Sequence, residues 1–220
     1  MRRSWAVPAA LIPAVSTVLL AWPAVASAVT AAPKNIILNP GAEAGPGSAD
    51  GSTVPVPHWT VKKGGVFTAV QYGASGGFPA KTDPGPKSRG VNFFAGGNGG
   101  KANAQTATQT DSLKSFAGVI AAGATFTLAG YLGGFDGQTD NATVTVTWED
   151  STGATLGTAT IGPVTEGARH GNTGLLSKSL MGTVPAGSAT ALVTIKCVRH
   201  SGAYDDGYAD NLSLTIVASS

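Results

Sequence analysis

Two carboxylates near opposite ends of the chain are the first candidates for chemistry. Glu43 closes the segment Asn39-Pro40-Gly41-Ala42-Glu43, and Asp210 stands just before the alternating residues 212–217. If the first and last strands of the fold are neighbours, the two carboxylates could meet. Calcium takes six to eight oxygen ligands, and backbone carbonyls of an irregular turn can supply those that side chains do not. Without a metal, Glu43 would bond loop amides and Asp210 would cap a turn.

Aromatic and polar residues in several predicted loops could form a sugar-binding surface. Such a surface needs an exposed ring for the apolar face of a pyranose, with polar groups beside it for the hydroxyls. If the loops gather at one end of the domain, they would make a shallow cleft. Alternatively the rings cover the edges of the core, because scattered surface aromatics are common. The candidate ligand-binding residues are Tyr131, Phe135, Arg169, His170, Arg199 and Tyr204.

The chain has few candidates for catalysis. The segment 73–77, Gly-Ala-Ser-Gly-Gly, fits the G-x-S-x-G pattern around Ser75, but Phe78 and Pro79 follow, so the helix that this motif needs cannot begin there. Glu149 ends a predicted strand with no apolar surroundings evident to raise its pKa. The three histidines are too scattered for a zinc motif. The sequence therefore predicts a protein that is not an enzyme, with a hydrolase as the least favoured alternative.

The remaining acidic groups and the lone cysteine have structural interpretations. Asp205-Asp206-Gly207 is first of all a turn signal. Asp136 and Asp140 are spaced like ligands of a metal loop, but such a loop also needs a later Glu, so we interpret them as solubilising loop residues. Cys197 is the only cysteine, so no intrachain disulfide can form, and its alternation with apolar neighbours predicts that it is buried.

Strands must position most of these residues. Apolar and polar residues alternate over 124–131 and 143–148, which is the period of a half-buried strand. One short helix is predicted at 113–121, capped by Asp111 or Ser112. Regular strands with a single helix predict an all-β fold, a two-sheet antiparallel β-sandwich. Further strands are predicted at 35–38, 66–72, 89–94, 104–111, 155–161, 175–183, 189–199 and 212–217.

The opening motif and the closing strand resemble the two ends of galactose-binding-like jelly-roll domains, which include many secreted bacterial carbohydrate-binding modules. The matching positions are Asn39, Gly41, Glu43 and Asp210, while Ala42 stands where that family often has Phe. The resemblance implies a jelly roll, non-catalytic binding of a glycan or cell-surface polysaccharide, and a structural calcium ion (Ca2+) held by Glu43 and Asp210. An extracellular protein-interaction or matrix domain is the alternative, because one fold hosts many functions.

The first 28 residues are typical of a secretory signal peptide. Arg2 and Arg3 precede an apolar run that ends in Ala26-Ser27-Ala28, and prolines inside the run argue against a membrane span. We therefore expect a secreted, extracellular protein in which residues 29–220 form one galactose-binding-like β-sandwich domain, with no membrane span after cleavage. The signal holds two of the 14 basic residues and none of the 12 acidic ones, so the remainder is balanced and nothing in its charge favours nucleic acid.

Overall fold

The computed structural model describes Met1 and residues 33–99 and 103–219 of the 220-residue chain. Residues Pro33–Ser220 form one compact unit. The predicted signal peptide lies outside the described residues apart from Met1. Among the residues described, no helix has both the length and the apolar character needed to cross a bilayer.

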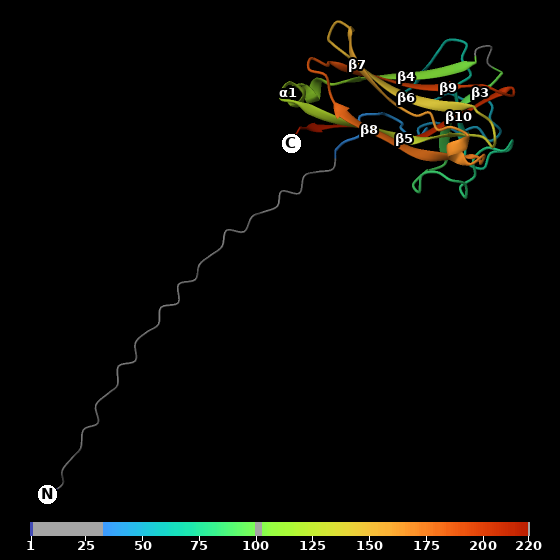
Figure 1. Cartoon of the computed structure of the whole chain (residues 1–220), viewed down its shortest axis with the longest axis horizontal. Helices are drawn as coiled ribbons and strands as arrows, with labels where there is room; N and C mark the ends of the chain where they lie inside the picture. The colour runs from blue at the N-terminus through green and yellow to red at the C-terminus, as the bar shows by residue number, and fades with distance from the viewer. Residues whose placement is uncertain (2–32, 100–102, 220) are drawn as a thin grey trace. The chain divides into compact units, whose positions relative to one another are not determined.

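The described strands form two stacked antiparallel sheets of five strands each (Figure 1). We name each sheet by its central strand. In the β9 sheet the order is β1 (Thr60–Val61), β4 (Ala104–Ser112), β9 (Thr190–Val198), β6 (Asn141–Glu149) and β7 (Thr155–Ile161); in the β10 sheet it is β2 (Thr68–Gln71), β3 (Asn92–Asn98), β10 (Tyr204–Ala218), β5 (Ala124–Gly134) and β8 (Gly174–Thr183). The predicted all-β sandwich is confirmed.

The predicted helix is present but begins differently. A 3-10 turn at Lys114–Phe116 leads into α1 (Ala117–Ala121), and neither has a capping side chain at its N-terminus. Ser112 accepts a hydrogen bond of 3.4 Å from the Lys114 amide, while Asp111 stays within β4. Tight 3-10 turns are common at helix starts, and here the turn replaces the capped first turn that the sequence predicts.

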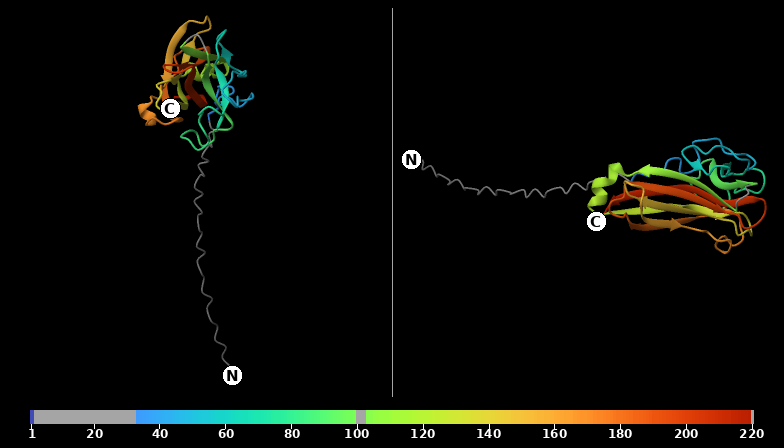
Figure 2. Two further views of the ribbon diagram at one scale, coloured as in Figure 1. Left: turned by 90° about the vertical axis from the view of Figure 1, so that its right-hand side faces the viewer. Right: turned by 90° about the horizontal axis from the view of Figure 1, so that it is seen from above.

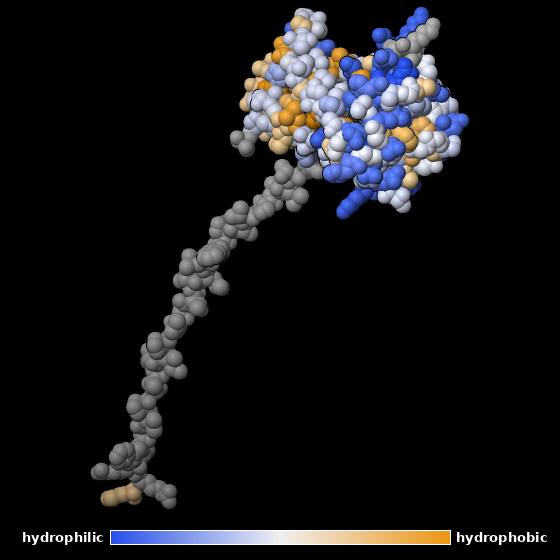
Figure 3. Space-filling view, turned by 45° about the vertical axis from the view of Figure 1, so that its right-hand side comes forward, coloured by the Kyte–Doolittle hydropathy of each residue, from blue (hydrophilic) through white to orange (hydrophobic). Residues whose placement is uncertain are grey.

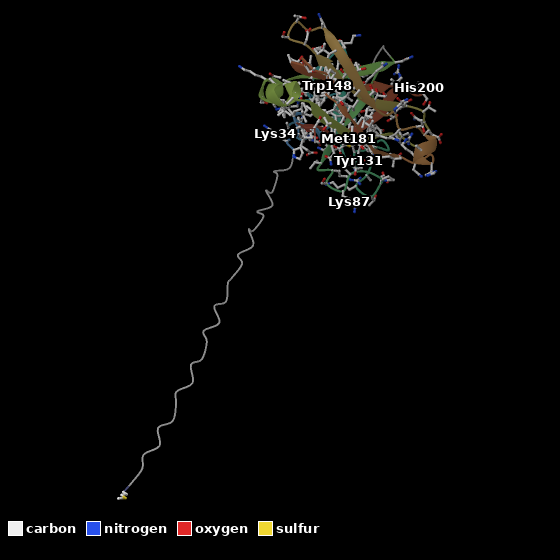
Figure 4. The ribbon with its side chains drawn as sticks, turned by 60° about the vertical axis from the view of Figure 1, so that its left-hand side comes forward. Lys34, Lys87, Tyr131, Trp148, Met181 and His200 are labelled. Carbon is white, nitrogen blue, oxygen red and sulfur yellow. The ribbon has the colours of Figure 1, made fainter. Side chains whose placement is uncertain are left out.

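Alternating side chains fill the space between the sheets. Every second residue of β6 is fully buried, and Trp148 packs against Phe126 of the facing sheet with ring centroids 5.2 Å apart. Figure 4 shows Trp148 within the body of the sandwich. Cys197 is also buried in this core, as its alternation predicts. Burial of apolar surface is the main source of stability in such a fold. No intrachain disulfide can add to it, since Cys197 is the single cysteine.

The beginning of the described domain lies against its last strand. Residues 35–38 do not form the strand that the sequence predicts. They still bond to β10: the Ile36 amide donates to the Leu214 carbonyl at 2.9 Å, and the Asn35 side chain bonds the backbone of Leu212 and Leu214. The Leu212 amide donates to the Pro40 carbonyl at 2.9 Å. The two ends of the domain are therefore neighbours, as expected.

A second, smaller aromatic cluster covers the other face of the β10 sheet. Its buried rings are contributed by a long loop and by β3 and β10, and they pack with centroid distances of 4.9 to 6.3 Å; they are Tyr72, Phe78, Phe93 and Tyr208. Helix α1 lies at one end of the sandwich, beside the C-terminal end of β10, and most of the long loops lie toward the other end (Figure 2). One sheet face is therefore covered by loop residues.

Candidate functional site

The predicted metal ligands converge on Gly41. A Cβ atom at Gly41 would lie 3.1 Å from the Asp210 Oδ1 atom and 3.8 Å from the Glu43 Cγ atom. Gly41, which has no side chain, therefore lies close to both acidic side chains. The structure brings the two predicted ligands into one site at the junction of the chain ends.

Asp210 is a buried carboxylic acid with two neutral partners. The Tyr72 hydroxyl donates to Oδ2 at 2.7 Å, and the Asn211 amide donates to Oδ1 at 2.6 Å. Burial raises the pKa of Asp210 to about 7, and the negative charge of Glu43 adds to the rise, while the Tyr72 hydrogen bond opposes it. Asp210 thus bears a charge near neutral pH only at a considerable desolvation cost.

Glu43 is exposed and holds the start of β3. Its Oε1 atom accepts hydrogen bonds from the amides of Val91 at 3.0 Å and Asn92 at 2.8 Å. Gly90, at φ 66°, lies beneath this carboxylate, and a Cβ there would come within 2.4 Å of the same oxygen. From the sequence, hydrogen bonding to loop amides is the alternative to metal binding by Glu43. The structure contains these hydrogen bonds.

The donor set at this site has the chemistry of a hard cation site. Both side chains offer carboxylate oxygens, which calcium prefers, and a cation between them would offset both the burial of Asp210 and its repulsion from Glu43. Among the described residues, no three side chains from His, Cys, Asp and Glu group as metal ligands. Backbone carbonyls or water would have to complete the coordination.

Arg169 ties two loops together. It is only 4% exposed, and its guanidinium donates to the backbone carbonyls of Asp136 (2.9 Å), Gln138 (2.8 Å) and Asn172. Its neighbour His170 is exposed, with φ at 54°, and borders a cavity of about 120 Å³ that Pro84 and Leu176 also line. Arg169 and His170 therefore lie in the same group of loops, but Arg169 is buried and His170 is exposed to solvent.

A second group of loop residues is organised by Asp140. This side chain is fully buried, and its carboxylate accepts hydrogen bonds from the amides of His200 (2.7 Å), Ser201 (3.0 Å) and Asp206 (3.1 Å). The interpretation of Asp140 as a solubilising residue is wrong, because it anchors the turn that carries Arg199. Arg199 in turn donates to the Ala203 carbonyl at 2.9 Å.

The three predicted aromatic ligand residues pack against the second aromatic cluster. Tyr204 meets Phe78 edge to face at a centroid distance of 5.1 Å, and Tyr131 and Phe135 are half-buried beside the same rings. The part of the surface that comes forward in Figure 3 is nevertheless mostly hydrophilic. The predicted ligand-binding residues are thus distributed around adjoining loops and strand ends, and their role in binding stays a prediction.

The predicted turn at 205–207 is wrong, because these residues belong to β10. Asp205 pairs with Gly97 of β3, and the register shifts before Tyr208 through a bulge-like irregularity. Burial raises the pKa of Asp205 to about 7 and that of Asp206 to about 6. The Tyr208 hydroxyl donates to Asp206, while the Asp205 Oδ2 atom is buried without a hydrogen-bond partner. Pairing of Asp205 with β3, and of the residues from Tyr208 onward with both β3 and β5, overrides the local turn signal.

The outward face of the β9 sheet is a threonine array that the sequence reading did not single out as a site. One row crosses all five strands: Thr160, Thr145, Thr194, Thr108 and Thr60 are register partners in succession. All are half-buried or exposed. The signal was available in the repeated Thr-x-Thr pattern of 106–110, 143–147 and 158–160. We call this surface the threonine face; its members are Thr60, Thr106, Thr108, Thr110, Thr143, Thr145, Thr147, Thr158, Thr160, Thr190 and Thr194.

The side chains considered for hydrolysis have ordinary structural partners. The Ser75 hydroxyl donates to the Ala49 carbonyl at 3.4 Å, in an exposed loop. Glu149 accepts a hydrogen bond of 3.2 Å from Thr190 at the end of β6. Neither bond is one that activates a nucleophile or a general acid.

Comparison with solved structures places the architecture among known jelly rolls. The structure titled Family 16 Carbohydrate Binding Module-2 superposes with a TM-score of 0.50 at 20% identity, over 82% of this chain and 99% of that one. The protein has the same sandwich fold. Carbohydrate-binding modules make up most of the structural neighbours. No protein-family model matches the sequence. The search of curated proteins also found no match.

Enzymes occur among the neighbours too. A Stig cyclase from Fischerella sp. TAU matches 84% of this chain and 98% of its own length at 14% identity, with a TM-score of 0.49. The enzymatically active domain of tailspike protein 4 of bacteriophage CBA120 matches at 16% identity and a TM-score of 0.48. The present chain covers 83% of its own length in that match but only 21% of the tailspike chain. One fold can host many functions, so the function has to be argued from the site.

Proposed function

We propose that the protein is a secreted, non-catalytic carbohydrate-binding domain. The observation that carries this proposal is the wide, polar and nearly uncharged outward face of the five-stranded β9 sheet. Hydroxyl groups that both donate and accept hydrogen bonds complement the hydroxyls of sugars. The hydrolase candidates Ser75 and Glu149 are engaged elsewhere, which supports a binding role over catalysis.

The same proposal includes a structural calcium ion held by Glu43 and Asp210. The approach of the Asp210 carboxylate and of the Glu43 Cγ atom to Gly41 supports it, as does the burial of Asp210. The ion would supply positive charge at the junction of the chain ends. It would stabilise the frame at this junction, away from the threonine face.

Binding to a panel of polysaccharides tests the function. The mature domain, mixed with neutral and anionic plant and microbial polysaccharides, should be retarded by at least one of them in native affinity electrophoresis. The domain should hydrolyse these polysaccharides no faster than a variant in which both hydrolase candidates are replaced (Ser75→Ala, Glu149→Gln). Retention by no polysaccharide, together with capture of an extracellular protein, would instead favour the protein-interaction alternative.

A further inference from the structure

The side chains of the threonine face are regularly spaced, so one ligand can contact several of them at once. Strand register places outward residues of β7, β6, β9 and β4 in successive rows, for example Thr158, Thr147, Leu192 and Thr110. Neighbouring strands lie about 4.8 Å apart, so a row across five strands is about 19 Å wide. The surface therefore offers repeated contacts over a length much greater than one sugar ring.

Threonine gives this face a fixed set of polar and apolar contacts. Each side chain carries a hydroxyl beside a methyl group, and branching at Cβ restricts its rotamers, so little side-chain entropy is lost on binding. The Thr145 and Thr160 hydroxyls lie 2.9 Å apart and bond each other. The face can thus bond ligand hydroxyls and contact ligand C–H groups at the same time.

Charge on this face is sparse and separated. Among the outward residues of β4, β9, β6 and β7, Lys196 and Glu149 are the charged ones. Glu149 lies at the end of β6 and bonds Thr190. Nothing there gathers positive charge for a polyanion, and no aromatic ring offers a stacking platform for a single sugar. The chemistry fits a neutral ligand that makes many weak contacts.

We propose that the threonine face binds an extended neutral polysaccharide whose chain runs across the strands of the β9 sheet. This inference rests on the proposed carbohydrate-binding function and adds the surface, the direction of the chain and the class of polymer. Sheets twist from strand to strand, so the rows of the face turn gradually. A single flexible chain can follow that turn, whereas the flat surface of a crystalline polymer cannot.

A matched pair of triple variants tests this assignment. The first replaces the centre of the longest row, Thr108→Val, Thr145→Val and Thr194→Val, which removes three hydroxyls while keeping β-branched side chains. The control makes the same change on the outward face of the β10 sheet, at Thr125, Thr127 and Thr215, which are half-buried in the same way. Thermal melting would verify that both variants fold.

Affinity electrophoresis in xylan and in mixed-linkage β-glucan, with polygalacturonate as the anionic polymer and xylobiose as a short competitor, gives the readout. We expect the face variant to bind a neutral polymer about tenfold more weakly or worse, since each lost hydrogen bond contributes about fivefold. The control should stay within about twofold, and xylobiose should compete poorly.

Each outcome decides a different point. If the wild-type protein binds a neutral polymer and both variants bind equally well, the threonine face is not the site, although the proposed function stands. Preference for polygalacturonate would overturn the neutral class of ligand. If the wild type binds no polysaccharide of the wider panel, the proposed function fails and this inference fails with it.

Discussion

Replacing Asp210 by Asn should change how stability depends on both pH and calcium. The substitution keeps the shape of a fully buried side chain but removes its charge and replaces one accepting oxygen by an amide that donates to the Tyr72 oxygen instead. In the native protein this carboxyl group bonds the Tyr72 hydroxyl and lies close to Glu43. The variant therefore isolates the cost of burying one negative charge at the junction of the chain ends.

The magnitude follows from the pKa of Asp210, which burial raises from 3.8 to about 7. The native state then holds this proton more tightly than the unfolded state does. The resulting stabilisation is complete below about pH 4 and is lost as the pH rises to about 7. One pH unit of pKa shift corresponds to about 1.4 kcal/mol, so the loss is at most about 4 kcal/mol.

Thermal melting at pH 4.5 and pH 8, with a chelator and then with excess calcium, measures the effect. With chelator, the Asp210→Asn protein should be about as stable as the wild type at pH 4.5 but more stable at pH 8, by up to about 10 °C in melting temperature. Calcium binding requires the deprotonated carboxylate, so calcium should stabilise the wild type at pH 8 and not at pH 4.5. The Asp210→Asn and Glu43→Ala proteins should not respond to calcium.

Asp111→Asn is the matched control. Burial also raises the pKa of Asp111, to about 6, but this residue lies in β4, outside the proposed ion site. Its variant should keep the full response to calcium. A wild-type protein indifferent to calcium at pH 8 would remove the ion from the proposal. An Asp210→Asn protein with the wild-type pH dependence would refute the argument from charge burial.

Two further predictions concern side chains that the structure buries. Arg169→Lys should lower the free energy of unfolding by about 2 kcal/mol, because the single nitrogen of Lys cannot reproduce bonds that two separate guanidinium nitrogens donate to three carbonyls. Chemical denaturation measures the loss, and an equally destabilising His170→Ala, at an exposed site, would contradict the explanation. The Cys197 thiol, whose pKa burial raises, should react with Ellman's reagent only after unfolding, and rapid labelling of the native protein would show that it is accessible.

The sequence was sufficient for the sandwich because strand alternation is a local signal. Residues such as Val144, Val146 and Trp148 point to one side at every second position, and the structure buries all of them. The proximity of the chain ends was also predicted, but through the resemblance of the motif around Glu43 and the strand after Asp210. Local alternation alone cannot say which strands become neighbours, since register is set by the whole sheet.

The sequence did not predict which polar side chains are buried. In the sequence, Asp140 and Arg169 are indistinguishable from ordinary charged loop residues. In the structure, each makes hydrogen bonds to several backbone groups of segments that are distant in sequence. The Asp-Asp-Gly segment shows the same limit. Its preference for a turn is a local property, whereas its place in β10 depends on the pairing of Asp205 with β3 and of the residues after the segment with β3 and β5.

The two sheets differ in what their outward residues are, and this difference explains where a binding surface can lie. On β3 and β10 the outward residues include Phe93 and Tyr208, which a long loop must cover to keep their rings from water. On β6 and β9 five of the ten corresponding positions are threonines, which satisfy both the strand preference for β-branched residues and contact with solvent. The β9 sheet can therefore leave its face free across all five strands, whereas the β3 and β10 part of the other sheet needs the loop cover. The same alternation that builds the core gives the β9 sheet an outward face suited to a polar ligand.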